Sequence, residues 1–183
     1  MVPRVDFGIN ALLVAFLVLL IQRRSGMQVF VFTNASSSRL GGPNALVNVK
    51  WNKGMRFTAT TEEGDSLTMD TDAESGGESH GFRPVKLVLV GLGGCTGMDI
   101  VWILKRQRQE VTGLEMNVTG TRRKKDPRYY EAVQIEYVVR GRNLRESAVK
   151  RAIELSEEKY CSVRGIFRPE VKVATSYRIE QEA

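Results

Sequence analysis

The sequence predicts an α+β domain, in which antiparallel sheets surround one long apolar helix in the order β-β-β-α-β-β-α-β. Three observations support this prediction. Residues 85–104 form a segment that is apolar on all sides and must therefore be buried. Segments before and after it alternate between apolar and polar residues, as half-buried strands do. A second helical segment with one apolar face then precedes a last alternating segment.

The composition is that of a soluble globular protein long enough to build one domain with a substantial core. Of its 183 residues, 42% are hydrophobic and 26% are charged, and this balance argues against wholesale disorder. The net charge is +6, and its positive charges cluster at 105–108, 122–125 and 140–151. No nucleic-acid motif accompanies these clusters, so we interpret them as solvated faces and predict no nucleic-acid partner.

Residues 1–45 precede the predicted domain, which spans 46–183. Their apolar run at Ala11–Ile21 is shorter than the about 20 residues that cross a bilayer. An arginine pair follows the run rather than preceding it, unlike in a signal peptide. The run is therefore a membrane-associated leader, an additional buried element, or the product of a start assigned upstream of Met27, which we favour. We expect a cytoplasmic protein, with N-terminal membrane association as the alternative, and a linker at 32–43.

Three strands are predicted before the central helix. They span 46–51, 55–61 and 66–70, with a turn at 52–54. The polar loop at 71–81 that follows has acidic residues at the spacing of a calcium-binding loop. However, Ser75 and Gly81 stand where such a loop needs glycine and glutamate, so the sequence does not predict a calcium site.

The central helix is predicted over Pro84–Gln109, with a kink or break near its glycines. Cys95 directly follows two glycines, where a helix could restart, and the amino end of a helix favours a thiolate. Asp99, one turn later, acts in the opposite direction and raises the thiol pKa unless a cation intervenes. The alternative is that Cys95 is a small buried apolar residue.

Two further strands, one helix and a final strand complete the prediction. The strands span 114–120 and 130–140 around a hairpin loop at 124–128, the helix runs from an Asn143 N-cap to residue 160, and the final strand spans 171–179. Cys161 stands at the end of this helix, near Glu154 and Glu157. It is either half-buried and structural, or it meets Cys95 in space, which spacing alone does not establish.

The sequence predicts neither a metal nor a cofactor. Two cysteines do not make a disulfide scaffold, and one histidine without a CxxC pair falls short of the four ligands of a structural zinc site. The glycines at 91 and 93, with Glu115 downstream, imitate a dinucleotide-binding turn. The third glycine, at 97, comes one residue late, and antiparallel strands rather than repeated βαβ units follow.

Two cysteine motifs carry a resemblance to a known family. Leu92–Asp99, followed by Ile103–Lys105, resembles the first cysteine motif of the OsmC/Ohr superfamily, and Ala152–Val163 resembles the second. Trp51–Phe57 is similar to the family's early strand turn. The resemblance covers residues 46–180 and leaves 1–45 outside.

The resemblance implies a tightly intertwined homodimer that reduces organic hydroperoxides at two active sites on the subunit interface. It implies that Cys95 attacks the peroxide and becomes a sulfenic acid, and that Cys161 condenses with it to a disulfide. An external dithiol, often a lipoyl group, would restore both thiols. Arg56 matches the family's thiolate-stabilising arginine, with a solvated strand charge as its alternative. The predicted function is therefore that of a thiol peroxidase.

The sequence departs from the peroxidase pattern at one place. Peroxidase members carry a glutamate, which orients the arginine, one or two residues after the proline that enters the central helix. Here Val85 and Lys86 follow Pro84, and Glu78 could substitute although its position does not match. The alternative function is therefore a non-enzymatic or redox-sensing relative that binds an apolar ligand at the dimer interface. A basic module that binds anionic surfaces is a third possibility.

Overall fold

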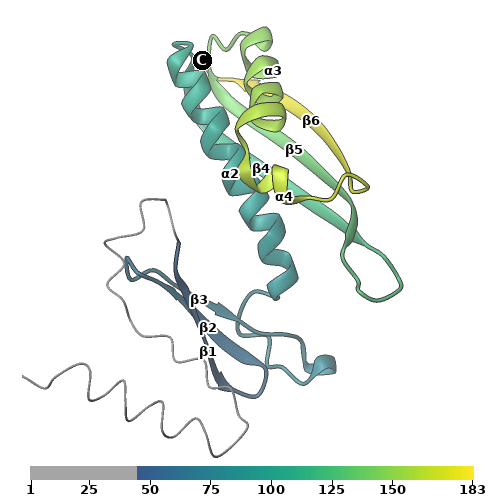
Figure 1. Cartoon of the computed structure of the whole chain (residues 1–183). Coiled ribbons are helices and arrows are strands. Elements are labelled where there is room, and N and C mark those ends of the chain that lie inside the picture. Colours follow the sequence, from purple (N-terminus) through teal and green to yellow (C-terminus); the bar gives the residue numbers. More distant parts are fainter. Residues whose placement is uncertain (1–44) are drawn as a thin grey trace, which may run out of the picture. The chain divides into compact units, whose positions relative to one another are not determined.

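The computed structural model describes residues 45–183 of the chain (Figure 1). The apolar run at 11–21 and the proposed start at Met27 lie outside the described residues. The described elements are β1 (Val47–Lys53), β2 (Arg56–Thr61), β3 (Ser66–Met69), η2 (Ala73–Ser75), α2 (Pro84–Arg106), β4 (Glu110–Arg122), β5 (Tyr130–Arg142), α3 (Glu146–Leu155), η3 (Ser156–Tyr160), α4 (Ser162–Ile166) and β6 (Lys172–Gln181). The α+β class and the order of the main elements are confirmed.

The first three strands form an antiparallel sheet in the order β1-β2-β3. The turn between β1 and β2 places Gly54 at φ 54°, a left-handed conformation that favours glycine, and the Trp51 indole N–H donates to the Gly54 carbonyl at 2.8 Å. Every residue of β1 is exposed, and Val47, Val49 and Trp51 are 52–60% exposed. The described part of one chain therefore leaves the apolar side chains of β1 uncovered.

Helix α2 runs through its glycines without the predicted break, and two of these glycines serve close packing. A Cβ atom added at Gly93 would lie 3.2 Å from a methyl group of Val118, and one at Gly97 would lie 2.6 Å from the Met116 methyl carbon. The two glycines thus let α2 approach β4 closely. The prediction that this helix is buried on every face is also wrong, since Met98 is 76% exposed and Trp102 is 52% exposed.

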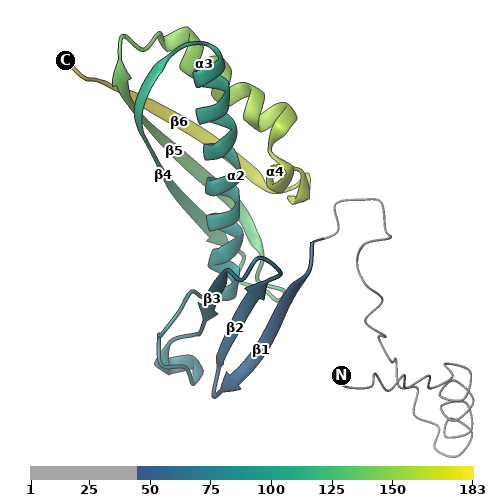
Figure 2. The ribbon, with the colours of Figure 1, turned by 90° about the vertical axis from the view of Figure 1, so that its left-hand side faces the viewer.

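The second sheet has the order β4-β5-β6, and α2 and α3 lie against one of its faces (Figure 2). Strands β4 and β5 form an antiparallel hairpin, but β6 pairs parallel with β5, contrary to the predicted antiparallel pairing. A parallel pair requires a crossover connection, and α3, η3 and α4 supply it. Although α2 is apolar and long enough to span a bilayer by composition alone, one side of it packs in this core.

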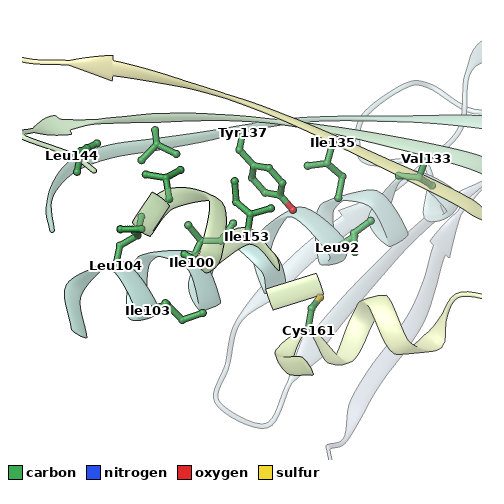
Figure 3. Close-up of a cluster of buried hydrophobic side chains, with 14 of the residues drawn as sticks. Leu92, Ile100, Ile103, Leu104, Val133, Ile135, Tyr137, Leu144, Ile153 and Cys161 are labelled. Carbon is green, nitrogen blue, oxygen red and sulfur yellow. The ribbon is translucent and has the colours of Figure 1, made fainter. Parts of the chain in front are cut away.

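The core fills the space between the second sheet and the helices. Leu92, Ile100 and Leu104 of α2 point toward Ile135 and Tyr137 of β5, with Ile153 of α3 between them (Figure 3). All six side chains are buried. The main contacts between elements fall into two groups. One group joins the strands of the first sheet, and the other joins α2, the second sheet and the later helices.

The second helical segment differs from its prediction at both ends. It begins at Glu146 with Arg145 as its N-cap, while Asn143 adopts a left-handed conformation at φ 49° and caps nothing. Asparagine tolerates that conformation, which suits the tight turn after β5. Regular α-helix stops at Leu155 and continues as a π-helix over Ser156–Tyr160. The predicted uniform helix up to residue 160 is therefore wrong in its last turn.

Candidate functional site

The structure brings the two cysteines together. The Sγ atoms of Cys95 and Cys161 and a carboxylate oxygen of Asp99 all lie within 4.8 Å of one another. Both cysteines are free thiols, Cys161 buried and Cys95 half-buried. The spatial meeting that spacing alone could not establish is thus present in a single chain.

A π-helical turn sets the direction of the Cys161 side chain. The Cys161 N–H donates to the Ser156 carbonyl at 2.8 Å, five residues back, which widens the turn by one residue. Cys161 itself is extended, at φ −69° and ψ 102°, and begins α4 as its N-cap. Because the chain changes direction here, the sulfur points toward the sheet and α2 (Figure 3).

The Cys161 thiol is protonated at neutral pH. Burial, together with the neighbouring Cys95, raises the pKa of Cys161 to about 11, although the Arg164 N–H, which donates to Sγ at 3.3 Å, acts in the opposite direction. A thiol with this pKa must lose its proton before it can act as a nucleophile.

Cys95 does not stand at the amino end of a helix, contrary to the sequence prediction. Helix α2 begins at Pro84, eleven residues earlier, and continues to Arg106. The favourable field of a helix terminus falls off within about one turn. Thiolate stabilisation by the helix end is therefore ruled out for Cys95, and any stabilising cation must come from elsewhere.

Three polar side chains surround the thiol pair. The Ser156 hydroxyl donates to Asp99 Oδ2 at 3.0 Å, which links the π-helix to α2. Tyr137 of β5 is fully buried, and its hydroxyl has no hydrogen-bond partner among the described residues. Burial raises the pKa of Tyr137 to about 12, so this hydroxyl keeps its proton and is free to donate it. Sequence reasoning missed Tyr137 and Ser156, which look like ordinary strand and helix residues.

Arg56 lies in a different cluster, on β2 of the first sheet. Its guanidinium contacts the carboxylate of Glu78, and its Nη2 lies 2.7 Å from His80 Nδ1. None of its hydrogen bonds or ion pairs in residues 45–183 involves Cys95 or Cys161. The structure therefore does not bring Arg56 to the thiols within one chain. It does show that Glu78, the residue considered as a substitute, pairs with the arginine.

Asp70 fixes the loop that presents Glu78 and His80. Its carboxylate is buried and accepts backbone N–H bonds from Thr71, Glu78 and His80 at 2.8, 3.2 and 3.1 Å. Burial acts to raise the pKa of Asp70, but these bonds and the nearby Arg56 charge together hold it below its usual value. An ionised Asp70 thus orders the partners of Arg56.

The convergence of two thiols and one carboxylate is one group short of a closed structural zinc site, which takes four protein ligands. Only one histidine occurs in the chain, and it pairs with Arg56 in the first sheet.

A cavity of about 630 Å³ is present in the described part of the chain, and neither Cys95 nor Cys161 is among its lining residues. It opens between the first turns of α2, the β4–β5 hairpin and the segment after Cys161. The residues that line the cavity are largely apolar, but three of them are arginines. The lining residues include Val85, Val88, Arg122, Arg128, Tyr129, Val163, Phe167 and Arg168. Its composition suits an apolar ligand that carries a negative charge.

One family model and several known proteins match this chain. The family model described as OsmC-like protein matches residues 76–176. Protein YhfA of Escherichia coli (strain K12) is 36% identical over 131 residues, which cover 72% of this chain and 95% of YhfA. The crystal structure of a hypothetical protein from Aquifex aeolicus VF5 is 34% identical, with a TM-score of 0.68 over 76% of this chain and 98% of that one.

A more distant structure shares the fold. The organic hydroperoxide resistance protein OhrB of Bacillus subtilis is 19% identical, with a TM-score of 0.52 over 74% of this chain and 98% of OhrB. At this identity the likeness concerns the fold alone.

Proposed function

The chain belongs to the OsmC-like protein family, and from this premise we propose that it reduces organic hydroperoxides through Cys95 and Cys161. The family supports a redox or peroxide-related role. The observation that carries the specific proposal is the proximity of the two thiol sulfurs, which lie within 4.8 Å of one another. A disulfide bond is about 2.05 Å long, so a small movement of the side chains would close it.

In this proposal the half-buried thiol reacts first. The Cys95 sulfur attacks one peroxide oxygen, the O–O bond breaks, and an alcohol leaves, so that Cys95 becomes a sulfenic acid. Cys161 then forms an S–S bond to Cys95 and the S–O bond breaks, which releases water. A dithiol, of the lipoyl type, reduces the disulfide and restores both thiols.

Proteins of this family are generally dimers, and we propose a homodimer here. The exposed apolar side chains of β1 and the exposed Met98 and Trp102 of α2 support this proposal, since monomers rarely leave such surfaces bare. Because Arg56 touches neither thiol of its own chain, we propose that it stabilises the Cys95 thiolate of the partner subunit. Proteins of this family are soluble, and we propose a cytoplasmic location.

A second candidate function has its own support. The arginine-lined apolar cavity of about 630 Å³ would suit a relative that binds an apolar ligand and uses the cysteines only as a redox switch. The missing glutamate after Pro84 also favours this alternative. Such a protein would form the disulfide slowly and would not turn over peroxide in the presence of a dithiol.

Peroxide consumption by wild type, Cys95→Ser and Cys161→Ser tests the proposal. With one equivalent of an organic hydroperoxide, wild type should form an intramolecular Cys95–Cys161 disulfide. Cys161→Ser should consume the same equivalent and stop at the sulfenic acid, detected as a mass increase on Cys95. Cys95→Ser should consume nothing. If wild type consumes no peroxide above the rate of Cys95→Ser, the ligand-binding alternative becomes the better account.

A further inference from the structure

We propose that Asp99, oriented by Ser156, is the proton acceptor for the Cys161 thiol when the disulfide forms. This inference deepens the proposed function and rests on it. It concerns the second step, in which the buried thiol must become a nucleophile although no basic side chain of the usual kind, such as histidine, stands beside it in the described part of the chain.

The geometry places the carboxylate of Asp99 where it can serve both sulfurs. Its oxygen lies within 4.8 Å of Cys95 Sγ and of Cys161 Sγ, a span that one water molecule or a small side-chain rotation would bridge. The Ser156 hydroxyl donates to Oδ2 at 3.0 Å. This bond holds the carboxylate toward the π-helix that directly precedes Cys161. The same turn therefore positions both the Asp99 carboxylate and the Cys161 thiol.

The charges around Asp99 leave it free to act as a base. Cys95 shares α2 with it, Tyr137 faces the site from β5, Glu157 comes from the π-helix, and Arg164 is on α4. Arg164 approaches Cys161 through its backbone N–H and acts on Glu157 by its charge. In residues 45–183 no arginine or lysine forms an ion pair with Asp99, so its charge is not already engaged by a cation.

Glu157 is the competing base, and it is less suited to the role. Burial raises the pKa of Glu157, and its Oε1 atom is buried without a hydrogen-bond partner. Glu157 is also not among the groups that converge on the two sulfurs. Asp99 is therefore the carboxylate that the geometry assigns to the thiol pair.

The proton balance of the step has one acceptor and one donor. The Cys161 thiol loses its proton to Asp99 as its sulfur attacks the Cys95 sulfur, and the S–S bond forms. The S–O bond of the sulfenic acid breaks at the same time, and protonated Asp99 returns the proton to the departing hydroxide, which leaves as water. Cys161 is oxidised, Cys95 is reduced, and Asp99 ends as it began.

The step can be followed without peroxide. An aromatic disulfide reagent that releases a coloured thiolate should react first at Cys95, and Cys161 should then displace the second coloured thiolate. The rate of the second release in the full-length reduced protein measures the nucleophilicity of Cys161. We expect Asp99→Asn to slow it by about 10²-fold at neutral pH, the range of general-base effects. Asp99→Glu should recover part of the rate.

The pH profile separates a proton acceptor from a residue that merely supports the structure. In wild type the rate of the second release should depend only weakly on pH around neutrality. In Asp99→Asn it should rise steadily with pH toward the titration of the thiol itself. Ser156→Ala, which keeps the carboxylate but removes its hydrogen bond, should fall between the two. Asp65→Asn, a neutralisation at an exposed turn of the first sheet, should leave the rate unchanged.

Two results would overturn the assignment. The first is an equal or faster second release in Asp99→Asn, which would mean that the carboxylate only raises the thiol pKa. The second is an unchanged rate in Ser156→Ala together with an unshifted pH profile in Asp99→Asn, both proteins being folded by circular dichroism. Should Asp99→Asn fail to fold, Ser156→Ala and Asp99→Glu decide the question. A wild type that resolves the reagent but consumes no peroxide would refute the proposed function and leave the role of Asp99 standing.

Discussion

The guanidinium of Arg56 contacts the carboxylate of Glu78, which lies 22 residues later in the chain. The pair connects strand β2 to the loop before α2, and the buried carboxylate of Asp70 holds that loop by three backbone N–H bonds. An acidic partner for the arginine therefore exists, but the chain supplies it before Pro84 rather than after it. The arginine is thus oriented from another point of the loop than in the peroxidase pattern.

If this pair serves the thiols of the partner subunit, removing the acid should resemble removing the arginine. We expect Glu78→Gln and Arg56→Ala each to lower the kcat/KM for an organic hydroperoxide by about tenfold, because the arginine charge is lost in one variant and is no longer oriented in the other. Lys53→Gln is the matched control, because Lys53 contacts the same Glu78 at 3.5 Å from an exposed position. Full activity in Glu78→Gln would contradict the pairing role.

The two thiols should differ in their reaction with iodoacetamide. Because burial raises the pKa of Cys161 to about 11, only about one molecule in 10⁴ carries its thiolate at neutral pH, so Cys95 should be labelled first. As the pH is raised toward that pKa, the rate at which Cys161 is labelled should increase about tenfold for each pH unit. Peptide mass spectrometry at two pH values would measure both rates. Equal labelling of the two residues at neutral pH would contradict the assigned environments.

The exposed apolar surfaces predict an obligate dimer. Sedimentation at micromolar concentration should give twice the 20.5 kDa chain mass, with an interface above about 2,000 Å². Met98→Glu, at a side chain of α2 that is 76% exposed, should weaken the dimer. Lys150→Glu, at an exposed position of α3, is the control for a change of charge. A stable monomer of the wild type would refute the prediction.

Two glycines of the second sheet should respond differently to alanine. A Cβ atom at Gly141 would lie 2.1 Å from the Glu110 carbonyl oxygen, and backbone cannot move aside as a side chain can. A Cβ atom at Gly113 would meet the Arg140 side chain at an ordinary 3.5 Å. We expect Gly141→Ala to cost about 1–3 kcal/mol of unfolding free energy and Gly113→Ala less than about 0.5 kcal/mol. Urea unfolding at one protein concentration would measure both.

Acid should release the loop that Asp70 holds. The pKa of Asp70 is lower in the folded chain than in the unfolded one, so the stability it contributes is present above the unfolded value of about 3.9 and is lost as the pH falls through the folded value. Asp70→Asn should lower the melting temperature at neutral pH and flatten its decline below about pH 5. Asp126→Asn, at a side chain 85% exposed, should do neither.

The fold class and the two cysteine motifs could be predicted because their signals are local. Alternation marks strands, an apolar segment marks the central helix, and each cysteine motif is continuous in sequence. The direction of β6 could not be predicted. The alternation of apolar and polar residues indicates which side chains of a strand are buried, but it does not indicate which strand pairs with it or in which direction. The glycines around Cys95 were misread as a helix break, because the side chains that Gly93 and Gly97 accommodate, Val118 and Met116, come from strand β4.

The polar residues around the two thiols could not be predicted from the sequence for a related reason. Tyr137 meets the site because of its register in β5, and Ser156 meets Asp99 because the helix widens there. Neither register nor a π-turn has a recognisable sequence signal. Arg56 was identified by its motif, but its pairing with Glu78 depends on a loop conformation that Asp70 imposes.

The π-helical turn at Ser156–Tyr160 makes the site sensitive to insertions and deletions rather than to substitutions alone. Residues in an α-helix are about 100° apart around the axis, so losing one residue between Ser156 and Cys161 would restore regular helix and turn the sulfur by about that angle. A descendant with such a deletion would keep both cysteines and the fold, yet its thiols would no longer face each other. In this branch of the family, the length of that turn is therefore as informative as the cysteines themselves when a redox role is to be inferred from sequence.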